Sequence, residues 1–244
     1  MAALKENEDS SNTKQSTPCV EEIDVSKWAG PGKFAIVVHN VFSLEECRSL
    51  IARAESNGFD KALVNIGNGR QMAMTDVRNS DRSIIDDPSF AEEMWQRIRA
   101  ATDDDPRLMT RGTSFHALGL NERLRFLRYD KGNYFASHCD GCFRRRDEAG
   151  VERRGEISKV TMQLYLNEEF EGGATRFMGN DESVGFDVVP KTGSVLLFEH
   201  QLLHEGSVLV AGRKYAIRTD VMYTNRPEFE EQTYANNPIV LSTD

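Results

Sequence analysis

The stretch LRFLRYDKGNYFASHCD, residues 124–140, decides the fold. It begins with a pattern typical of a β-strand and ends with residue types that can bind a metal ion. Its first six residues alternate in two sets of positions, as a strand with two different faces does. In a strand, residues i and i+2 project to the same face. His138 and Asp140 can therefore bind one metal ion while Cys139 points the other way.

A distant histidine, His204, would complete a triad of two histidines and one carboxylate on one side of the ion. It follows His138 by 66 residues and precedes Lys214 by ten. This ligand set leaves coordination positions open and suits a non-haem Fe(II) ion that activates O₂. Zinc accepts the same ligands with an open position, so a zinc hydrolase is an alternative interpretation.

Further strands are expected downstream. Residues 160–166 alternate as residues 124–129 do, and Gly- or Asn-containing turns follow each expected strand. The expected turns lie at residues 167–173, 180–185 and 190–193.

Two helices are expected before these strands. The sequence SLEE at 43–46 is a capping box that begins a helix ending at Gly58. The pair Asp87-Pro88 begins the second helix. The chain is therefore expected to be mostly β, with a double-stranded β-helix (jelly-roll) core preceded by N-terminal helices.

The chain of 244 residues is expected to form a single domain over residues 23–225. Residues 1–22 are rich in small polar and charged side chains and predict a disordered tail. Residues 226–244 are polar and predict a second tail. Residues 65–81 are either a solvated loop or a lid over an active site, and both interpretations stay open.

Composition restricts the partners and the location. A net charge of −9 argues against general nucleic-acid binding. No apolar run approaches the ~20 residues of a membrane span, and the N-terminus carries no signal-peptide pattern, so we expect a cytoplasmic protein. Cys139 and Cys142 form a single C-x-x-C that overlaps the H-x-D, so structural zinc is not expected.

The expected strand at 214–223 has one apolar face and one face that carries Lys214, Arg218 and Asp220. The charged face meets either solvent, as in many antiparallel sheets, or a polar barrel lumen. In a lumen, Lys214 or Arg218 could hold an acidic ligand through a charge-assisted hydrogen bond.

Taken jointly, these features resemble the Fe(II)- and 2-oxoglutarate-dependent dioxygenases, specifically the prolyl 4-hydroxylase-like group. The resemblance covers roughly residues 34–223 and is specific between 124 and 223. The matching stretches are RYDKGNYFASHCD (128–140), TMQLYLNEEFEGGATRF (161–177) and PKTGSVLLFEHQLLHEGSVLVAGRKYAIRTDVMY (190–223).

The resemblance implies that His138, Asp140 and His204 are the iron ligands. Lys214 matches the basic residue that pairs with the far carboxylate of 2-oxoglutarate. Arg213 is adjacent but is expected to point to the opposite face of the strand.

Other residues match the group less directly. Arg218 shares a face with Lys214 and is expected to help bind the co-substrate or the substrate. Tyr129 and Tyr165 match tyrosines near the co-substrate, and Thr175 lies in a G-G-x-T pattern. His200 competes for the second histidine position, but the His204-Glu205-Gly206 stretch and the spacing to Lys214 favour His204.

The implied reaction hydroxylates an unactivated C–H bond and releases succinate and CO₂, with Fe(II), 2-oxoglutarate, O₂ and ascorbate as its cofactors. The leading expected substrate is a prolyl or other residue in a peptide. A free amino acid or small metabolite, and a non-catalytic metal-binding jelly roll, are the alternatives. The basic residues 144–154 are either a recruiting patch for an anionic substrate or a solvated hairpin.

Overall fold

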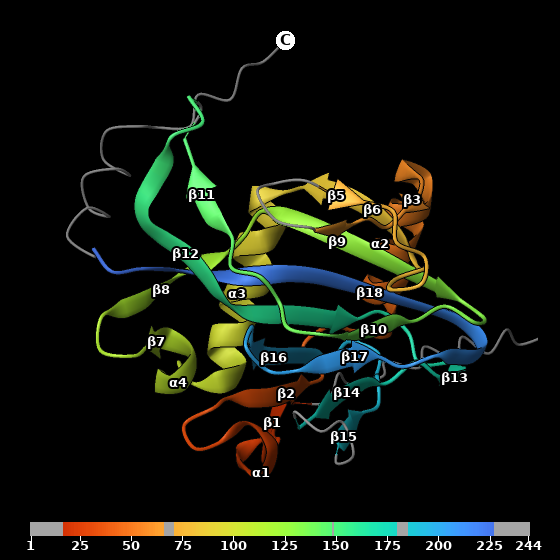
Figure 1. Ribbon diagram of the computed structural model, residues 1–244, viewed down its shortest axis with the longest axis horizontal. Helices are drawn as coiled ribbons and strands as arrows, with labels where there is room; N and C mark the ends of the chain where they lie inside the picture. The colour runs from red at the N-terminus through yellow and green to blue at the C-terminus, as the bar shows by residue number, and fades with distance from the viewer. Residues whose placement is uncertain (1–16, 66–70, 148, 180–184, 227–244) are drawn as a thin grey trace, which may run out of the picture.

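The computed structural model describes residues 17–65, 71–147, 149–179 and 185–226. Its larger sheet runs across the molecule in the order β1-β2-β16-β12-β18-β9-β6-β3 (Figure 1). The strands in this order are Cys19–Glu22, Ala35–His39, Val195–Glu199, Glu152–Tyr165, Leu209–Thr224, Arg123–Asp130, Asp81–Asp86 and Asp60–Lys61. Four short strands are attached to it: β7 (Thr110–Arg111), β8 (Phe115–Leu120), β11 (Arg144–Arg146) and β13 (Phe170–Gly172).

A smaller sheet has the order β10-β17-β14-β15. Its strands are Phe135–His138, His204–Gly206, Thr175–Met178 and Gly185–Val188. A separate hairpin pairs β4 (Val64–Asn65) with β5 (Gln71–Met72). The mostly β core of jelly-roll type agrees with the sequence prediction.

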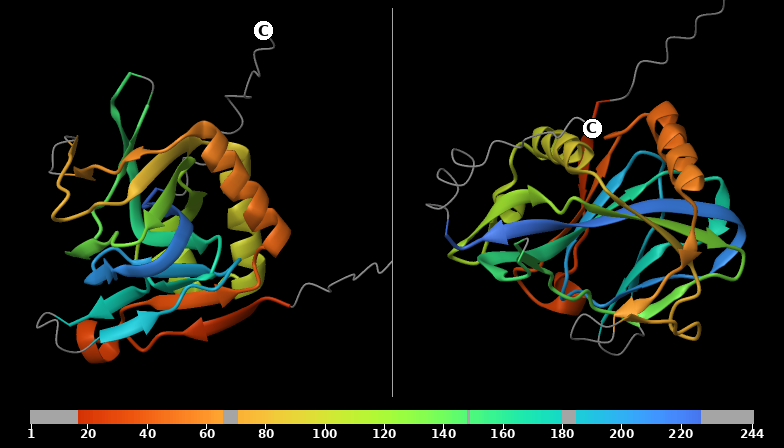
Figure 2. Two further views of the ribbon diagram at one scale, coloured as in Figure 1. Left: turned by 90° about the vertical axis from the view of Figure 1, so that its right-hand side faces the viewer. Right: turned by 90° about the horizontal axis from the view of Figure 1, so that it is seen from above.

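Helices cover the outer face of the larger sheet (Figure 2). The two long ones, α2 (Leu44–Asn57) and α3 (Pro88–Thr102), contribute to a core that also contains side chains of β2, β9, β12 and β18. Two single-turn helices, α1 (Ser26–Ala29) and α4 (Pro106–Met109), complete the set within the described residues.

Both long helices begin as the sequence predicted. Ser43 caps α2 through a full capping box with Glu46, and the helix ends before Gly58 at a φ of 84°. The Asp87 side chain accepts a hydrogen bond from the backbone of Phe90, and Pro88 fills the first turn of α3.

The face of β18 that carries charges is buried, which decides between solvent and lumen. Ile217 and Val221 pack into the core beneath the helices. On the opposite face Lys214 and Asp220 are each only 3% exposed. Arg213 points away from them and pairs with Asp130 at the surface, as the strand alternation required.

The predicted disordered tail, residues 1–22, includes four residues that form a strand. Residues 19–22 form β1, which pairs antiparallel with β2, Cys19 opposite His39 and Glu22 opposite Ile36. All four side chains of β1 are exposed, so backbone pairing at a sheet edge holds a segment whose polar composition suggested disorder. Residues 1–16 and 227–244 lie outside the described residues.

Residues 65–81 are not a single loop. β5 pairs with β4, an isolated bridge joins Arg78 to Phe135, and Asp81 begins β6. Residues 66–70, which include Arg70, lie outside the described residues. No helix among the described residues is long and apolar enough to cross a membrane.

Candidate active site

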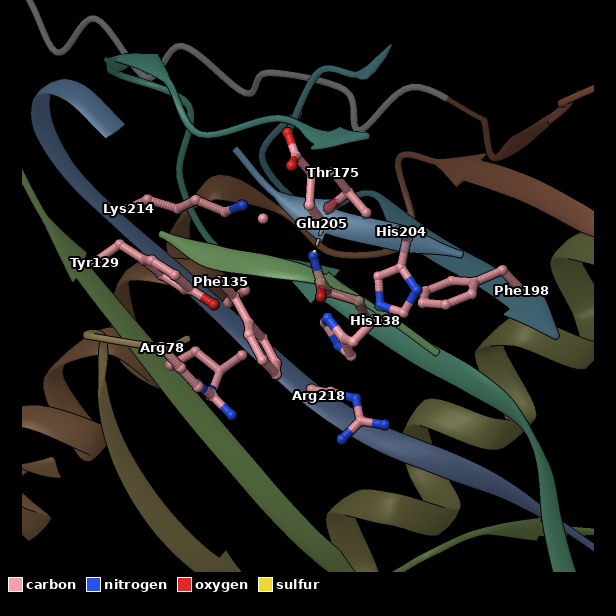
Figure 3. Close-up of a pocket in the computed structure, with 14 residues that line it drawn as sticks. Arg78, Tyr129, Phe135, His138, Thr175, Phe198, His204, Glu205, Lys214 and Arg218 are labelled. Carbon is pink, nitrogen blue, oxygen red and sulfur yellow. Dashed lines mark hydrogen bonds between the residues drawn. The ribbon is translucent and has the colours of Figure 1, made fainter. Parts of the chain in front are cut away.

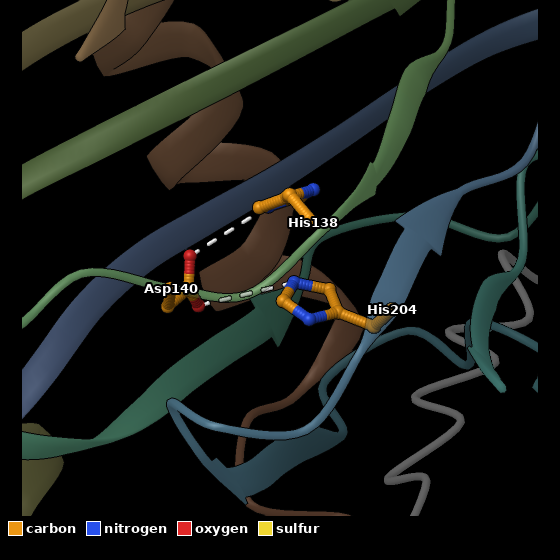
Figure 4. A group of neighbouring side chains, drawn as sticks. All are labelled: His138, Asp140 and His204. Carbon is orange, nitrogen blue, oxygen red and sulfur yellow. Dashed lines mark ion pairs between the residues drawn. The ribbon is translucent and has the colours of Figure 1, made fainter. Parts of the chain in front are cut away.

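Strand pairing brings the two distant histidines together. β10 and β17 are antiparallel neighbours, and His138 lies opposite His204 in their register. Asp140 follows β10, where its backbone N–H donates to the carbonyl of His200 at 2.8 Å. One ligand atom of each of His138, Asp140 and His204 lies within 4.8 Å of the other two. Figure 4 shows the Asp140 carboxylate facing both imidazole rings.

Backbone hydrogen bonds fix the orientation of both imidazole rings. Nδ1 of His138 is 2.8 Å from the carbonyl oxygen of Ala136, and Nδ1 of His204 is 2.9 Å from that of Leu202. Each Nδ1 therefore donates, and each Nε2 keeps its lone pair. The Nε2 atoms lie 3.7 and 3.8 Å from the two carboxylate oxygens of Asp140. Metal-binding histidines are held in this way in proteins.

The charge states of the triad also fit a metal ion. Burial raises the pKa of Asp140, but Arg218, whose Nη2 lies 2.8 Å from Oδ1, and the two histidines outweigh it and hold the pKa well below its ordinary value. Burial lowers the pKa of His204 to about 4. An ionised carboxylate and a neutral imidazole are the forms that bind metals. The hydroxyl of Thr161 donates to Asp140 Oδ2 and fixes the second oxygen.

A cavity beside the triad contains Lys214 at its other end (Figure 3). The Lys214 Nζ donates to the carbonyl of Gly173 at 2.6 Å and lies 5.4 Å from the ring centres of Tyr129 and Tyr165. No carboxylate among the described residues pairs with it, and burial lowers its pKa to about 7. The cavity thus has the candidate metal-binding triad at one end and, at the other, a cation with no carboxylate partner among the described residues.

The other sequence-predicted residues lie around this cavity at different depths. Tyr129 and Thr175 line it. Tyr165 is fully buried behind Thr175, and the two hydroxyls are 2.8 Å apart. Arg218 also lines it, but Asp140 and Asp220 both pair with its guanidinium.

His200 lies outside the triad. Its ring is buried, and Nε2 is 3.4 Å from Asp220 Oδ1. Burial lowers the pKa of His200, but the neighbouring Asp220 and Cys142 raise it to about 9 overall. A protonated imidazole does not bind a metal, whereas neutral His204 can.

Arg78, Phe135, Gln163 and Glu205 also line the cavity and were not predicted as site residues. Arg78 is 8% exposed, its guanidinium lies 4.6 Å from the Phe135 ring centre, and its Nε donates to Ser80. Gln163 had a signal in the sequence, because it lies two residues from Tyr165 on a strand. For Arg78, the sequence contains no signal of a role in the site beyond its position within residues 65–81.

The basic residues 144–154 form part of a hairpin of β11 and β12. Arg145 pairs with Glu122 and Glu156, and Arg146 pairs with Glu152. These ion pairs favour the solvated hairpin over a recruiting patch made of these arginines.

Comparisons with known proteins agree with this geometry. Residues 124–219 match the family model of the 2OG-Fe(II) oxygenase superfamily. Two Arabidopsis thaliana proteins are similar: probable prolyl 4-hydroxylase 8, 27% identical over 208 residues, and prolyl 4-hydroxylase 1, 25% identical over 199 residues. These matches cover 75% and 74% of this chain, which spans 66% of the length of each relative.

Solved structures share the fold. The viral collagen prolyl hydroxylase of Paramecium bursaria Chlorella virus-1 superposes with a TM-score of 0.52 at 19% identity, covering 78% of this chain and 97% of that one. A Trichoplax adhaerens prolyl hydroxylase bound to a hypoxia-inducible-factor peptide gives 0.54 at 17% identity, covering 88% and 90%. Residues 124–219 thus match the 2OG-Fe(II) oxygenase superfamily, and the chain as a whole is similar to prolyl 4-hydroxylases in sequence.

Proposed function

We propose that this chain hydroxylates a prolyl residue of a peptide or protein with Fe(II), 2-oxoglutarate and O₂, releasing succinate and CO₂. The observation that supports the proposal most is that one cavity is lined by His138, His204 and Lys214, whose ammonium has no carboxylate partner among the described residues. A protein that only stores a metal does not need a buried cation aimed at the same cavity. The named activities of the similar Arabidopsis proteins favour a prolyl substrate.

The triad residues have the role of holding the metal. His138, Asp140 and His204 would bind Fe(II) on one side and leave positions open on the other. When bound, the iron supplies the O₂ activation that hydroxylation of an unactivated C–H bond requires. The backbone bonds of both Nδ1 atoms prevent ring rotation, and Thr161 and Arg218 fix the Asp140 carboxylate.

Lys214 has the role of anchoring the co-substrate. 2-Oxoglutarate has two carboxylates, one of which belongs to the keto acid that a metal can chelate. The other would pair with the Lys214 ammonium and restore the charge that burial disfavours. Tyr129 shapes the same end of the cavity directly, and Tyr165 does so through Thr175.

Two finer points belong to the proposal. Ascorbate would return oxidised iron to Fe(II) between turnovers, and the reaction would take place in the cytoplasm. A free amino acid or small metabolite is less favoured as a substrate, because the similar proteins are named as prolyl hydroxylases.

A turnover screen tests the proposal. Anaerobically iron-loaded protein is exposed to O₂ and 2-oxoglutarate with proline-containing peptides, free proline or other free amino acids. Succinate is measured together with the mass of each candidate substrate. We expect succinate and a 16-Da mass increase in a peptide. A mass increase only in a free amino acid would replace the peptide substrate with a free amino acid. Protein that retains zinc and releases no succinate would contradict the hydroxylation reaction.

A further inference from the structure

A second cavity lies beyond the metal-binding triad, on the side away from Lys214. Its volume is about 400 Å³, within the ~300–1,000 Å³ typical of ligand sites. Its wall includes the ionisable residues Arg111, Lys159, Glu199 and His200 and the aromatic residue Phe115.

Two contacts attach this cavity to the metal-binding loop. The backbone N–H of Asp140 donates to the carbonyl of His200, and the thiol of Cys139 lies 3.4 Å from the carbonyl oxygen of Gln201. His200 and Gln201 both line the cavity. A molecule that occupies the cavity therefore lies next to the triad.

Lys159 lies at a register shift in strand β12. Thr161 and Gln163 point from this strand toward the triad and the first cavity. In the pairing of β12 with β18, Ser158 lies opposite Met222 and Val160 opposite Val221, so Lys159 is an extra residue without a partner on β18. Such bulges are common beside active sites, where they redirect a side chain. Here the residue at the bulge is a cation whose side chain lines the second cavity.

The carboxylates near the wall of the second cavity have other partners, and none of the described ones pairs with Lys159. Glu199 is paired with Arg111 and lies 3.6 Å from Lys33. Asp220 accompanies His200 at 3.4 Å. The Lys159 ammonium lies 3.8 Å from the Phe115 ring centre, and no described carboxylate forms an ion pair with it. In a chain of net charge −9, this is a local excess of positive charge beside the triad.

We propose that the second cavity is a substrate subsite that receives an acidic side chain of the peptide, with Lys159 as its ion-pair partner and Phe115 as its apolar wall. The proposal rests on the proposed peptide substrate. Lys159 is two residues along the strand from Thr161, which contacts Asp140, or ~7 Å at ~3.3 Å per residue. An extended peptide covers that length in two to three residues, so the acidic residue lies close to the target residue.

Peptide binding tests the proposal directly. Fluorescent peptides with one central proline carry Glu, Gln or Lys at each of the three positions on either side. Their affinity for the full chain, loaded anaerobically with Fe(II) and 2-oxoglutarate, is measured by anisotropy. At one or two positions we expect the Glu peptide to bind about 10- to 100-fold more tightly than the Gln peptide, as a charge-assisted hydrogen bond allows.

Variants assign the preference to one residue. Lys159→Gln should remove the preference for Glu, and Lys159→Glu should transfer it to the Lys peptide. Lys27→Glu makes the same charge change at a side chain 74% exposed on α1 and should leave the preference intact. Thermal unfolding midpoints check that each variant is folded. Lys159→Gln removes the charge without reversing it and remains informative if Lys159→Glu does not fold.

The outcomes separate this proposal from the proposed function. Hydroxylated proline peptides with equal affinity for Glu and Gln versions would overturn the subsite and leave the function standing. A Lys159-dependent preference for Glu without hydroxylation of any peptide would support the subsite and overturn the proposed hydroxylation. Competition by free glutamate or inorganic phosphate at the same concentration as the Glu peptide would assign the cavity to a free anion and overturn the peptide subsite.

Discussion

Two cations on the inner face of β18, Lys214 and Arg218, lie four residues apart in opposite electrostatic surroundings. Arg218 is paired with Asp140 at 2.8 Å and with Asp220 at 3.4 Å. Lys214 donates to a backbone carbonyl and has no carboxylate partner in the described chain. A buried ion without a counterion is costly, and proteins keep one mainly where a ligand completes it. The charge of Arg218 is thus balanced within the protein, whereas under the proposed function the charge of Lys214 is balanced by the co-substrate.

Removing the carboxylate that Arg218 holds should give the largest effect. Asp140→Ala deletes one of the three proposed metal ligands and leaves Arg218 beside the two histidines. We expect Fe(II) binding and 2-oxoglutarate turnover to fall by more than about 100-fold, because even the loss of an outer-shell partner costs about 10- to 100-fold. Iron content after anaerobic loading and succinate release measure the two losses.

Asp130→Ala is the matched control, because Asp130 is a partly exposed carboxylate paired with Arg213. It should retain both activities. Succinate production by Asp140→Ala at the rate of the unmodified chain would remove the triad from the reaction.

Removing the cation without a partner should affect the co-substrate rather than the metal. Lys214→Met keeps a long side chain in the buried space but deletes its charge. The concentration of 2-oxoglutarate for half-maximal velocity should rise about 10- to 100-fold, with a smaller change in the velocity at saturation. Initial rates of succinate release against 2-oxoglutarate concentration measure this difference.

Arg213→Met removes a neighbouring cation that points to the surface, so its 2-oxoglutarate dependence should stay unchanged. If Lys214→Met also left it unchanged, the anchor would have to be another cation of the cavity, Arg78 or Arg218.

Weakening the paired cation should have a smaller effect, and on the metal. Arg218→Met leaves the triad in place but removes the guanidinium that lowers the pKa of Asp140. Fe(II) affinity should fall about tenfold, as for other outer-shell partners. The pH below which the metal is lost should rise, because the carboxyl group then takes up a proton more readily. Metal titrations at several pH values measure both changes, and equal affinity at every pH would contradict the role given to Arg218.

Local rules account for the part of this fold that the sequence predicted. The capping box at Ser43 and the Asp87-Pro88 start act within one helical turn, and both were right. The i, i+2 rule placed His138 and Asp140 together and separated Arg213 from Lys214. The proximity of His204 came from resemblance, since the register that places it opposite His138 joins strands 66 residues apart.

The remaining features depend on contacts that no local pattern contains. Arg78 reaches the cavity because its segment bridges to Phe135, 57 residues later. β1 is ordered by pairing with β2 although its own composition is polar. Lys159 lies at a register shift between two long strands, and such a shift can be recognised only when both strands and their pairing are known.

The contrast between the two cations also predicts how stability depends on pH. Burial lowers the pKa of Lys214 from 10.5 to about 7 in the folded chain. Between these two values the unfolded chain binds more protons at this site, so the free energy of unfolding should rise with pH over that range. A single pKa unit corresponds to about 1.4 kcal/mol, so the contribution should be on the order of 1 kcal/mol or more.

Across this pH range without ligand, the unfolding midpoint of the unmodified chain should rise with pH relative to that of Lys214→Met, since the variant lacks this titrating group. A bound carboxylate stabilises the ammonium form and raises the pKa of Lys214. Added 2-oxoglutarate with metal should therefore flatten the slope of the unmodified chain and leave that of Lys214→Met unchanged. Parallel pH profiles in both conditions would mean that Lys214 keeps its proton without a ligand, and that its charge is balanced by the protein as that of Arg218 is.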